Sequence, residues 1–533
     1  MNRTARHSAA LPVTLTVTLA VLGATTLGCT TPPGPGTGTG PAAGYVDPAG
    51  RPELRVFYQQ KLEWKACGAY QCAELTVPRD YAHPANGKTF VLPVARALTA
   101  QRTGRLGSVI ANPGGPGASG VTSLLEEGMT DSFSEKVRDR FDIVSFDPRG
   151  VGGSTPALTC GGMEEEEEKE EEETATDPAD PFHPKTEAER ADVLASAKEE
   201  ADACAKGSAA LLRHVGTEDV ARDMDVLRAA LGESQVTYLG WSYGTALGTS
   251  YAEQFPRRVR AMVLDGAVDP SLDWSKRAVS QGVGFRRAVD DYAMYCADVA
   301  GESCPGSTPE EIRTVLDGLF ERTAREPLPV DGEEFGLDAN GLLDAVVQSM
   351  YTPEAQWKDL SEALSDADRG DGTKLAELTN PAEPAGPEGA DTAKVPSDNE
   401  QAVLQAVNCF DVPHPRDAQA YWNALAPAEK AAGRYGTSTV TAALTCKDWP
   451  TSAKKPHRVA ATGVAPVLVV GTTGDAATPY EEAESLASQF PGGMLLTYEG
   501  LGHTAYGRSN TCVTQHVDDY LIARTPVPTG TTC

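Results

Sequence analysis

The sequence of 533 residues predicts an α/β fold with a mostly parallel sheet, helices on both faces, and a large, mainly helical insertion. Short apolar and β-branched runs alternate with longer helix-like stretches, a pattern typical of strands that are buried on both sides. The last two strand-like runs are separated from the others by residues 265–465. That stretch is too long for a connection, so it predicts the insertion.

The expected strands are short runs of Val, Ile, Leu and aromatic residues bounded by turn-forming residues. In chain order they span 108–112, 141–147, 235–239, 261–264, 466–470 and 494–498. Helices are expected between and after these strands because apolar residues recur there at helical spacing. They span 187–206, 218–231, 245–255, 480–489 and 512–522.

The long gap has its own helix-like stretches, at 278–299, 309–325 and 339–350. A Gly-, Pro- and Asp-rich stretch follows at 366–399, which we expect to be a mobile loop. An inserted helical lid over a sheet edge would restrict what reaches the residues at that edge.

The net charge and the glutamate run indicate which binding partners to expect. The formal net charge is −29, and such a surface repels phosphate, so we expect no nucleic-acid partner. Residues 164–173 are glutamates interrupted only by Lys169, which predicts a solvated loop. Composition and motifs leave the oligomeric state open.

The N-terminus predicts export. Arg3 and Arg6 precede an apolar stretch at 11–22 that is too short to span a membrane stably. The sequence then reaches Cys29 in a pattern that resembles a bacterial lipoprotein signal, with Thr26 where leucine is usual. We expect Cys29 to be lipidated, which gives membrane contact only through a lipid anchor on the extracellular side. Ordinary cleavage and secretion is the alternative.

Cysteine usage agrees with an oxidising compartment, because ten cysteines remain when Cys29 is set aside. Pairing each cysteine with its neighbour in the chain would give Cys67–Cys72, Cys160–Cys204, Cys296–Cys304, Cys409–Cys446 and Cys512–Cys533. No spacing resembles a zinc site, and no H-E-x-x-H occurs, so we expect no metal and no cofactor.

These features divide the chain into five parts. Residues 1–29 are the export signal and 30–50, rich in Pro, Gly and Thr, are a flexible tether. Residues 51–268 form the first part of the sheet domain, 269–456 the lid, and 457–533 the second part of the sheet domain.

The segment Gly240-Trp241-Ser242-Tyr243-Gly244 fits G-x-S-x-G and lies between an expected strand and an expected helix. In that context a serine occupies a sharp, strained turn that lifts its hydroxyl above the sheet. Ser242 is therefore the candidate nucleophile. A serine hydroxyl is weak at neutral pH and needs a base, and the base needs an acid to orient it.

The base and the acid are expected after the serine, in the order Ser, Asp or Glu, His. His83, His183 and His214 precede Ser242, whereas His503 follows the last expected strand within a glycine-rich turn. His503 is the candidate base. Asp475 follows the strand at 466–470 and is the candidate acid. It could instead cap the helix that begins near residue 480, although Thr478 is better placed for capping.

The loop Asn112-Pro113-Gly114-Gly115-Pro116-Gly117 predicts an oxyanion hole. One donor would be the backbone N–H of Tyr243, after the nucleophile, and the other that of Gly115. The same loop contains G-x-G-x-x-G at 115–120, a dinucleotide-binding outline. Two prolines in the turn and the Ser, Asp and His set count against that interpretation. Arg149, in Asp-Pro-Arg-Gly at 147–150, is expected to hold a loop through backbone carbonyls.

Together these motifs resemble a known family. Gly-Gly-Pro-Gly at 114–117 with Trp-Ser-Tyr-Gly at 241–244 resembles the α/β-hydrolases related to proline iminopeptidase. The signal, Asp-Pro-Arg-Gly at 147–150, Gly-x-Ser-Tyr-Gly-Thr at 240–245 and the late Asp and Gly-His resemble the exported tripeptidyl aminopeptidases of actinobacteria, over about 54–533. The resemblance implies an α/β-hydrolase fold and release of short peptides, di- or tripeptides, from free N-termini through an acyl-enzyme on Ser242.

An exopeptidase needs a group that recognises the substrate ammonium, and a lid carboxylate is suited to that task. Asp411 is the candidate, because a disulfide at Cys409 would hold it rigidly, although a solvated or capping aspartate is the alternative. Two other functions remain open: a carboxylesterase or lipase with the same catalytic residues, and a surface adhesin on a hydrolase scaffold.

Overall fold

The computed structural model describes residues 50–101, 103–161, 182–333, 336–379, 395–452 and 454–533, which all lie in one compact unit, Ala43–Cys533. The expected export signal, Cys29, the glutamate run at 164–173 and the middle of the 366–399 stretch lie outside the described residues. Among the helices of the described ranges, none is both long and apolar enough to cross a bilayer.

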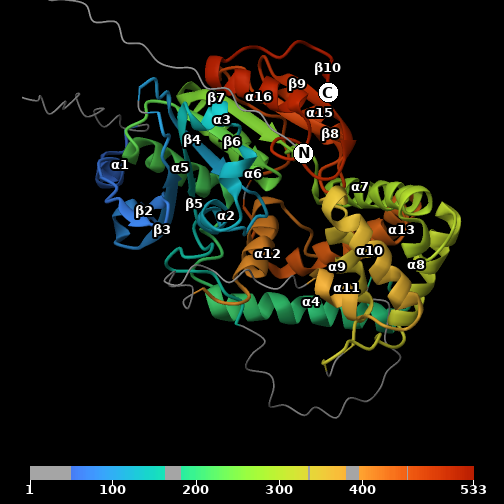
Figure 1. Cartoon of the computed structure of the whole chain (residues 1–533). Helices are drawn as coiled ribbons and strands as arrows, with labels where there is room; N and C mark the ends of the chain where they lie inside the picture. The colour runs from blue at the N-terminus through green and yellow to red at the C-terminus, as the bar shows by residue number, and fades with distance from the viewer. Residues whose placement is uncertain (1–49, 102, 162–181, 334–335, 380–394, 453) are drawn as a thin grey trace, which may run out of the picture. The chain divides into compact units, whose positions relative to one another are not determined.

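Within these ranges ten strands form one sheet in the order β1-β2-β3-β5-β4-β6-β7-β8-β9-β10 (Figure 1). The chain enters through antiparallel strands, and from β5 to β10 all neighbours are parallel. The strands are β1 Lys65–Cys67, β2 Tyr70–Pro78, β3 Thr89–Ala97, β4 Gly107–Asn112, β5 Phe141–Phe146, β6 Val236–Trp241, β7 Val259–Asp265, β8 Leu468–Gly474, β9 Met494–Leu501 and β10 Thr531–Thr532.

Alternate residues of the central strands enter two separate apolar clusters, because successive side chains point to opposite faces. Ile110 and Tyr238 belong to one cluster, and Val109 and Leu239 to the other. The first face is covered by α1 Arg55–Tyr58, α5 Thr217–Ala230, α6 Tyr243–Gln254 and α15 Tyr480–Gln489. The second is covered by α2 Gly120–Leu125, α3 Glu135–Arg138 and α16 Thr511–Ala523.

The insertion falls between β7 and β8, which are neighbours in the sheet (Figure 1). Its helices are α7 Trp274–Tyr295, α8 Pro309–Thr323, α9 Ala339–Ser349, α10 Pro353–Asp368, α11 Thr373–Thr379, α12 Asn399–Asp411, α13 Ala418–Ala432 and α14 Arg434–Ala442. Several pack around an apolar cluster of their own that includes Phe285, Tyr292, Phe320 and Trp357. The expected loop over 366–399 is wrong for its first part, because α11 forms there and Leu375 is buried in this cluster.

Packing does not follow the expected boundaries at 269 and 456. Val403 and Ala406 of α12, and Trp449 beyond α14, are buried in the same cluster as the sheet residues. Conversely, Ala197 of α4 Glu187–Ser208 packs with Tyr421 and Leu444 of the insertion. The insertion is therefore joined to the sheet domain along α4 and α12.

The described cysteines form five disulfides. They are Cys67–Cys72, Cys160–Cys204, Cys296–Cys304, Cys409–Cys446 and Cys512–Cys533, the pairing that neighbour order gives. Three of them join segments more than 20 residues apart in the chain. The Cys160–Cys204 bond ties a loop residue to α4, and the Cys409–Cys446 bond ties α12 to the end of the insertion. The Cys512–Cys533 bond ties the start of α16 to the C-terminus.

Candidate active site

The candidate residues all follow parallel strands at the same edge of the sheet. Ser242 comes directly after β6, Asp475 directly after β8, and His503 two residues after β9. Gly114 and Gly115 follow β4, which pairs with β6. In α/β proteins ligands bind at the carboxyl ends of the strands, so this edge is the expected place for a site.

Ser242 has a strained backbone, with φ of 55° and ψ of −124°. The turn is tight enough that a Cβ atom at Gly240 would lie 2.4 Å from the carbonyl oxygen of Gly244. A Cβ atom at Gly114 would lie 2.9 Å from the Cβ of Ser242. These contacts explain the glycines of G-x-S-x-G and of the glycine-rich loop, because any side chain there would push the strand, the helix and the loop apart.

Asp475 and His503 are brought together from loops 28 residues apart in sequence. The His503 Nδ1 atom lies 2.8 Å from Oδ1 and 3.0 Å from Oδ2 of Asp475. Because a carboxylate can only accept, Nδ1 carries the hydrogen and Nε2 is left as an acceptor. The backbone N–H groups of Ala477, Thr478 and Thr504 also donate to Asp475.

The charge state of Asp475 follows from these contacts. Burial by itself would raise the pKa of the Asp475 carboxyl, but the charge of His503 and the donated hydrogen bonds outweigh it and hold the pKa below the ordinary value. Asp475 therefore stays ionised at neutral pH, which orients the imidazole and stabilises its protonated form.

The other ring nitrogen of His503 is buried without a hydrogen-bond partner in the described chain, and the residue lines a cavity. His503 is 9 % exposed, and its Nε2 atom has no hydrogen-bond partner in the described part of the chain. His503 and Ser242 both line one cavity of about 330 Å³, together with Trp241, Tyr351 and Arg508. Ser242 Oγ makes no hydrogen bond to this nitrogen in the structure, and catalytic hydrogen bonds of this kind often form only in the complex with substrate.

The two expected oxyanion donors lie beside the nucleophile. Tyr243 is the first residue of α6, so its N–H has no acceptor within the helix. Gly115 has φ of 95° and follows Gly114, which packs against Ser242. Neither N–H donates to any other residue that the structure describes. Both groups are therefore available to an oxyanion formed at Ser242.

The G-x-G-x-x-G pattern in the same loop does not form a dinucleotide site. A Cβ atom at Gly117 would lie 2.6 Å from the carbonyl oxygen of Glu400. The backbone of α12 thus packs directly on the glycine that would have to face a pyrophosphate. The glycine serves the contact between the insertion and the loop.

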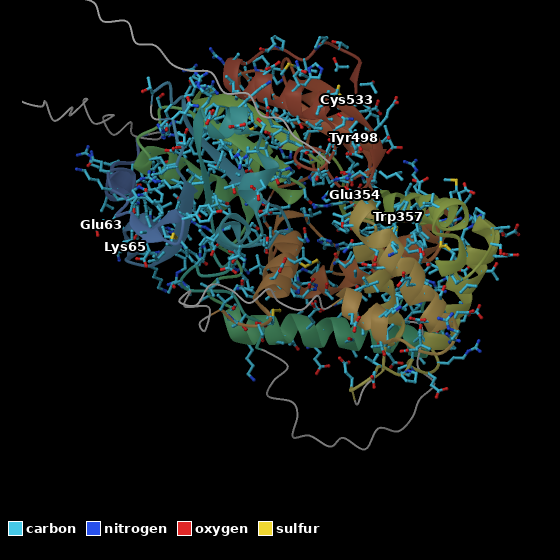
Figure 2. The ribbon with its side chains drawn as sticks, in the orientation of Figure 1. Glu63, Lys65, Glu354, Trp357, Tyr498 and Cys533 are labelled. Carbon is cyan, nitrogen blue, oxygen red and sulfur yellow. A yellow bond between two sulfur atoms is a disulfide. The ribbon has the colours of Figure 1, made fainter. Side chains whose placement is uncertain are left out.

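Arg508 holds the histidine loop and reaches the insertion. Its Nε donates to the carbonyl oxygens of His503 and Thr504, at 2.9 and 3.0 Å. Its Nη1 donates to Glu354 at 2.9 Å. Glu354 lies on α10 one turn before Trp357, which is buried in the core of the insertion (Figure 2). Arg508 therefore links the candidate base to the insertion.

Asp411 lies elsewhere. Its carboxylate accepts hydrogen bonds from the backbone N–H and the hydroxyl of Thr217, at the first turn of α5. It lines a second cavity of about 470 Å³, whose lining includes Tyr243 but neither Ser242 nor His503. The structure thus places Asp411 at a helix N-terminus, where a carboxylate is favourable, and not in the cavity of Ser242.

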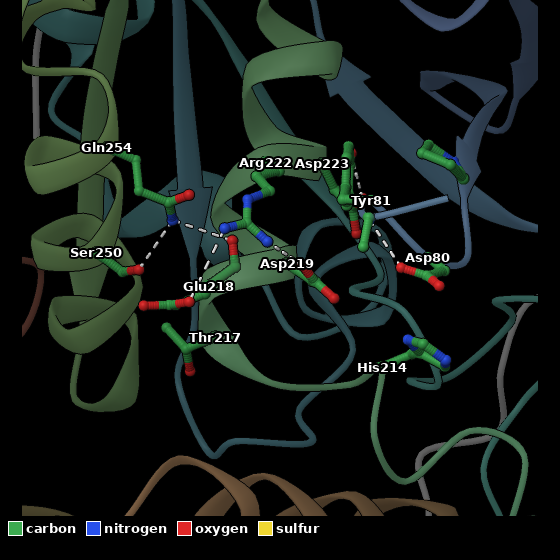
Figure 3. A network of polar contacts seen from close by, with 12 residues as sticks. Asp80, Tyr81, His214, Thr217, Glu218, Asp219, Arg222, Asp223, Ser250 and Gln254 are labelled. Carbon is green, nitrogen blue, oxygen red and sulfur yellow. Dashed lines mark hydrogen bonds and ion pairs between the residues drawn. The ribbon is translucent and has the colours of Figure 1, made fainter. Parts of the chain in front are cut away.

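The wall of this second cavity is rich in paired charges, which Figure 3 shows from close by. Arg222 pairs with Asp219 and Glu218 on its own helix, and Tyr81 donates to Asp223 at 2.8 Å. The Arg149 side chain is fully buried. It donates to the carbonyl oxygens of Pro78, Arg79 and His214 and forms an ion pair with Asp223. Arg149 therefore ties loops together, as the sequence predicts.

Thr478 contributes a contact that the sequence does not reveal. Its hydroxyl lies 3.4 Å from His503 Nδ1, and the residue is 8 % exposed. Thr478 does not cap α15, because the N-cap position of this helix is Pro479 and no side chain caps it. The signal that could have found it is its position three residues after the candidate acid, on the same loop.

Comparisons with known proteins agree with this geometry. Residues 107–332 match the family described as alpha/beta hydrolase fold, and residues 431–533 match the family described as TAP-like protein. The chain is 35% identical to serine protease Hip1 of Mycobacterium tuberculosis over 499 residues, covering 89% of this chain and 91% of the relative.

Two further relatives are similar in extent. Tripeptidyl aminopeptidase of Streptomyces lividans is 33% identical over 485 residues, covering 89% of this chain and 86% of the relative. Carboxylesterase B of Mycobacterium tuberculosis is 34% identical over 519 residues, covering 94% and 92%.

The parallel sheet, the strained serine turn and the Asp–His pair define an α/β-hydrolase enzyme with a helical insertion. Within that class the chain belongs to the tripeptidyl-aminopeptidase-like family of serine peptidases.

Proposed function

We propose that this enzyme is an exported serine exopeptidase that releases di- or tripeptides from free N-termini through an acyl-enzyme on Ser242. One observation carries the proposal most directly. His503 lines the same cavity as Ser242, its Nδ1 atom is bonded to Asp475, and its Nε2 atom has no partner in the described chain. The relative named tripeptidyl aminopeptidase, similar over most of its length, supports the substrate class.

In the proposed reaction, Ser242 Oγ attacks the carbonyl carbon of the scissile peptide bond and His503 Nε2 takes the hydroxyl proton. The developing alkoxide accepts from the N–H groups of Gly115 and Tyr243, a stabilisation of several kcal/mol. His503 then returns the proton to the leaving amine as the C–N bond breaks. Water then attacks the acyl carbon of the ester on Ser242 while the same nitrogen takes a proton from it. That proton passes to Ser242 Oγ as the acyl C–O bond breaks, and the short peptide leaves as a carboxylic acid.

The insertion supports an exopeptidase rather than an endopeptidase. Tyr351 and Thr352, between α9 and α10, line the cavity of Ser242, so the insertion forms part of its wall. A wall of this kind limits how much of a substrate fits on one side of the scissile bond.

Export is part of the proposal and rests on the sequence of residues 1–50 and on the disulfides. Five disulfides are typical of an oxidising compartment. We propose that Cys29 carries the lipid anchor. Expression of the full chain with labelled fatty acid tests this: label in the membrane fraction that is lost in Cys29→Ser supports it, and an unlabelled, secreted chain overturns it.

The substrate class is tested with peptide p-nitroanilides that carry free or acetylated amino groups. We expect tripeptide substrates with a free amino group to be turned over at least about 100-fold faster than acetylated ones. An acetylated substrate would leave the enzyme group that binds the ammonium buried without a partner, which is costly. Mass spectrometry of products from an unblocked peptide library then gives the number of residues released. Ser242→Ala is the control and should abolish turnover with folding nearly unchanged.

A carboxylesterase is the second candidate, because a relative of equal similarity is named carboxylesterase B. The same residues cleave esters with less assistance to the leaving group. A panel of p-nitrophenyl esters separates the two. If esters are turned over and every peptide with a free amino group is left intact, the peptidase proposal fails and the esterase stands.

A further inference from the structure

Asp265 is a fully buried carboxylate beside the candidate triad that the proposed reaction does not use. It is the last residue of β7, and it pairs in register with Trp241, the residue before the nucleophile. None of its surface is exposed. A buried carboxylate is costly unless its hydrogen bonds are satisfied, so its contacts have to be accounted for.

The two ends of Asp265 bind two different parts of the site. Its main-chain carbonyl accepts the backbone N–H of Ser242 at 2.8 Å. Its side-chain oxygens accept the N–H of Ala505, both at 3.0 Å, and one of them accepts the N–H of Tyr506 at 2.7 Å. One residue therefore holds both the nucleophile and the loop of His503.

Both of the held segments are strained. Ser242 has φ of 55°, and Thr504, between His503 and Ala505, has φ of 65°. Such non-glycine conformations persist only where the surroundings fix them. The contacts of Asp265 lie next to each of the two strained residues, so they are placed to supply that constraint.

The carboxylate also adds a negative charge to the site. Its charged neighbours are Asp475, on the loop after β8, and His503, after β9. Burial, followed by repulsion from Asp475, raises the pKa of Asp265 to about 6 against the opposing effect of its hydrogen bonds and of His503. Above that pH two carboxylates, Asp475 by direct contact and Asp265 through its charge, favour the imidazolium that forms at His503.

We infer that Asp265 is a positioning residue of this active site: it fixes Ser242 and the loop of His503 at a set separation and supplies a second negative charge to the protonated histidine. The inference rests on the proposed roles of Ser242, Asp475 and His503. Asp265 touches neither substrate nor reacting atoms in this scheme.

The test is Asp265→Asn, which keeps the size of the side chain but removes its charge and one of its acceptors. We expect kcat to fall about 10- to 100-fold with KM changed less than twofold, because only the alignment of the reacting groups is lost. The acidic limb of the kcat/KM profile should move to lower pH, since His503 loses a charge that favours its protonated form.

A matched control is Asp142→Asn. Asp142 is also buried, at 4 % exposure, and it also accepts a backbone N–H, that of Thr99 at 2.9 Å. It lies near the start of β5, whereas the candidate residues follow the strand ends. We expect this variant to keep the wild-type kcat and pH profile. If kcat fell equally in Asp265→Asn and Asp142→Asn, the effect would come from removing any buried charge, and the inference would be wrong.

Labelling of Ser242 by a fluorophosphonate separates this inference from the proposed function. If the wild type is not labelled, the proposed nucleophile fails. If the wild type is labelled and Asp265→Asn is labelled at the same rate, with the same pH dependence, only the positioning role fails.

Thermal unfolding of each variant is measured first, with Asp265→Ser as a second variant. If both Asp265 variants are unfolded at the assay temperature while Asp142→Asn is folded, Asp265 is a structural residue and the inference is overturned.

Discussion

The backbone N–H of His503 donates to the carbonyl oxygen of Tyr351 at 2.8 Å, so the candidate base is bonded directly to the inserted lid. The ring of Tyr351 also lies edge-on to the imidazole, with centroids 5.1 Å apart. A Cβ atom at Gly502 would lie 2.6 Å from Pro353 and 2.9 Å from the Tyr351 carbonyl oxygen. The lid therefore supports the catalytic loop as well as covering the cavity.

Arg508→Ala tests this support. The variant loses the donors to His503 and Thr504 and the link to Glu354. We expect kcat to fall about 10-fold or more, because a misplaced histidine costs alignment. Glu354→Gln is the control: its carboxylate is 54% exposed, so breaking that pair should change stability by less than about 1 kcal/mol and leave kcat near wild type. Equal kcat in Arg508→Ala and wild type would show that the loop does not depend on Arg508.

Asp475→Asn tests the Asp–His pair. The amide can donate to Nδ1, which would move the hydrogen to Nε2 and remove the acceptor at that nitrogen. We expect kcat to fall by about 1,000- to 10,000-fold. Circular dichroism checks that the variant is folded, and active-site titration checks its concentration. A loss below about tenfold would mean that Asp475 is not the orienting acid.

Arg149→Met tests the buried network that Arg149 forms. Arg149 and Asp223 both have fully buried side chains, so the variant leaves Asp223 without its cation. Removing one partner of such a pair is expected to lower the free energy of unfolding by about 3–5 kcal/mol. Arg313→Met is the control, because its pair with Asp290 is more than a third exposed and worth about 1 kcal/mol at most. Urea denaturation measures both, and equal losses would contradict the assignment.

The sequence predicts the parallel part of the sheet because those strands are continuous apolar runs. β4, β5, β6 and β7 begin and end within two residues of their expected positions, and α15 Tyr480–Gln489 matches its expected range. β8 and β9 run four and three residues beyond their expected ends. The antiparallel strands β2 and β3 give no such signal. Pro93 and Arg96 interrupt β3, and its register with β2 and β5 depends on pairing across the chain.

The active site also has residues that the sequence predicts and residues that only the structure reveals. Chain order and turn chemistry identify Ser242, Asp475 and His503, because strand ends converge at one edge of a parallel sheet. Tyr351, Arg508 and Asp265 act through backbone contacts or single charges that form no motif, so only tertiary packing reveals them. Closeness to the Cys409 disulfide predicts that Asp411 is held rigidly, but it does not predict which cavity the residue lines, which depends on packing against α5.

Asp411 gives a prediction of pH dependence. Burial raises the pKa of its carboxyl to about 6 in the folded chain, against its hydrogen bonds to Thr217, whereas an unfolded aspartate titrates at about 3.9. The folded state therefore binds more protons between pH 4 and 6, and stability falls as the pH rises through that window.

Asp411→Asn should remove this fall, because the amide does not titrate and still accepts from Thr217. The free energy of unfolding, measured at pH 4.5 and pH 7, should then drop less in the variant than in the wild type, by on the order of 2 kcal/mol. If the two proteins lose stability in parallel between these pH values, Asp411 is already charged at pH 4.5 and the burial argument is wrong. Asp411→Asn should also keep its KM for peptide substrates, because the structure places this carboxylate in a cavity that is not lined by Ser242.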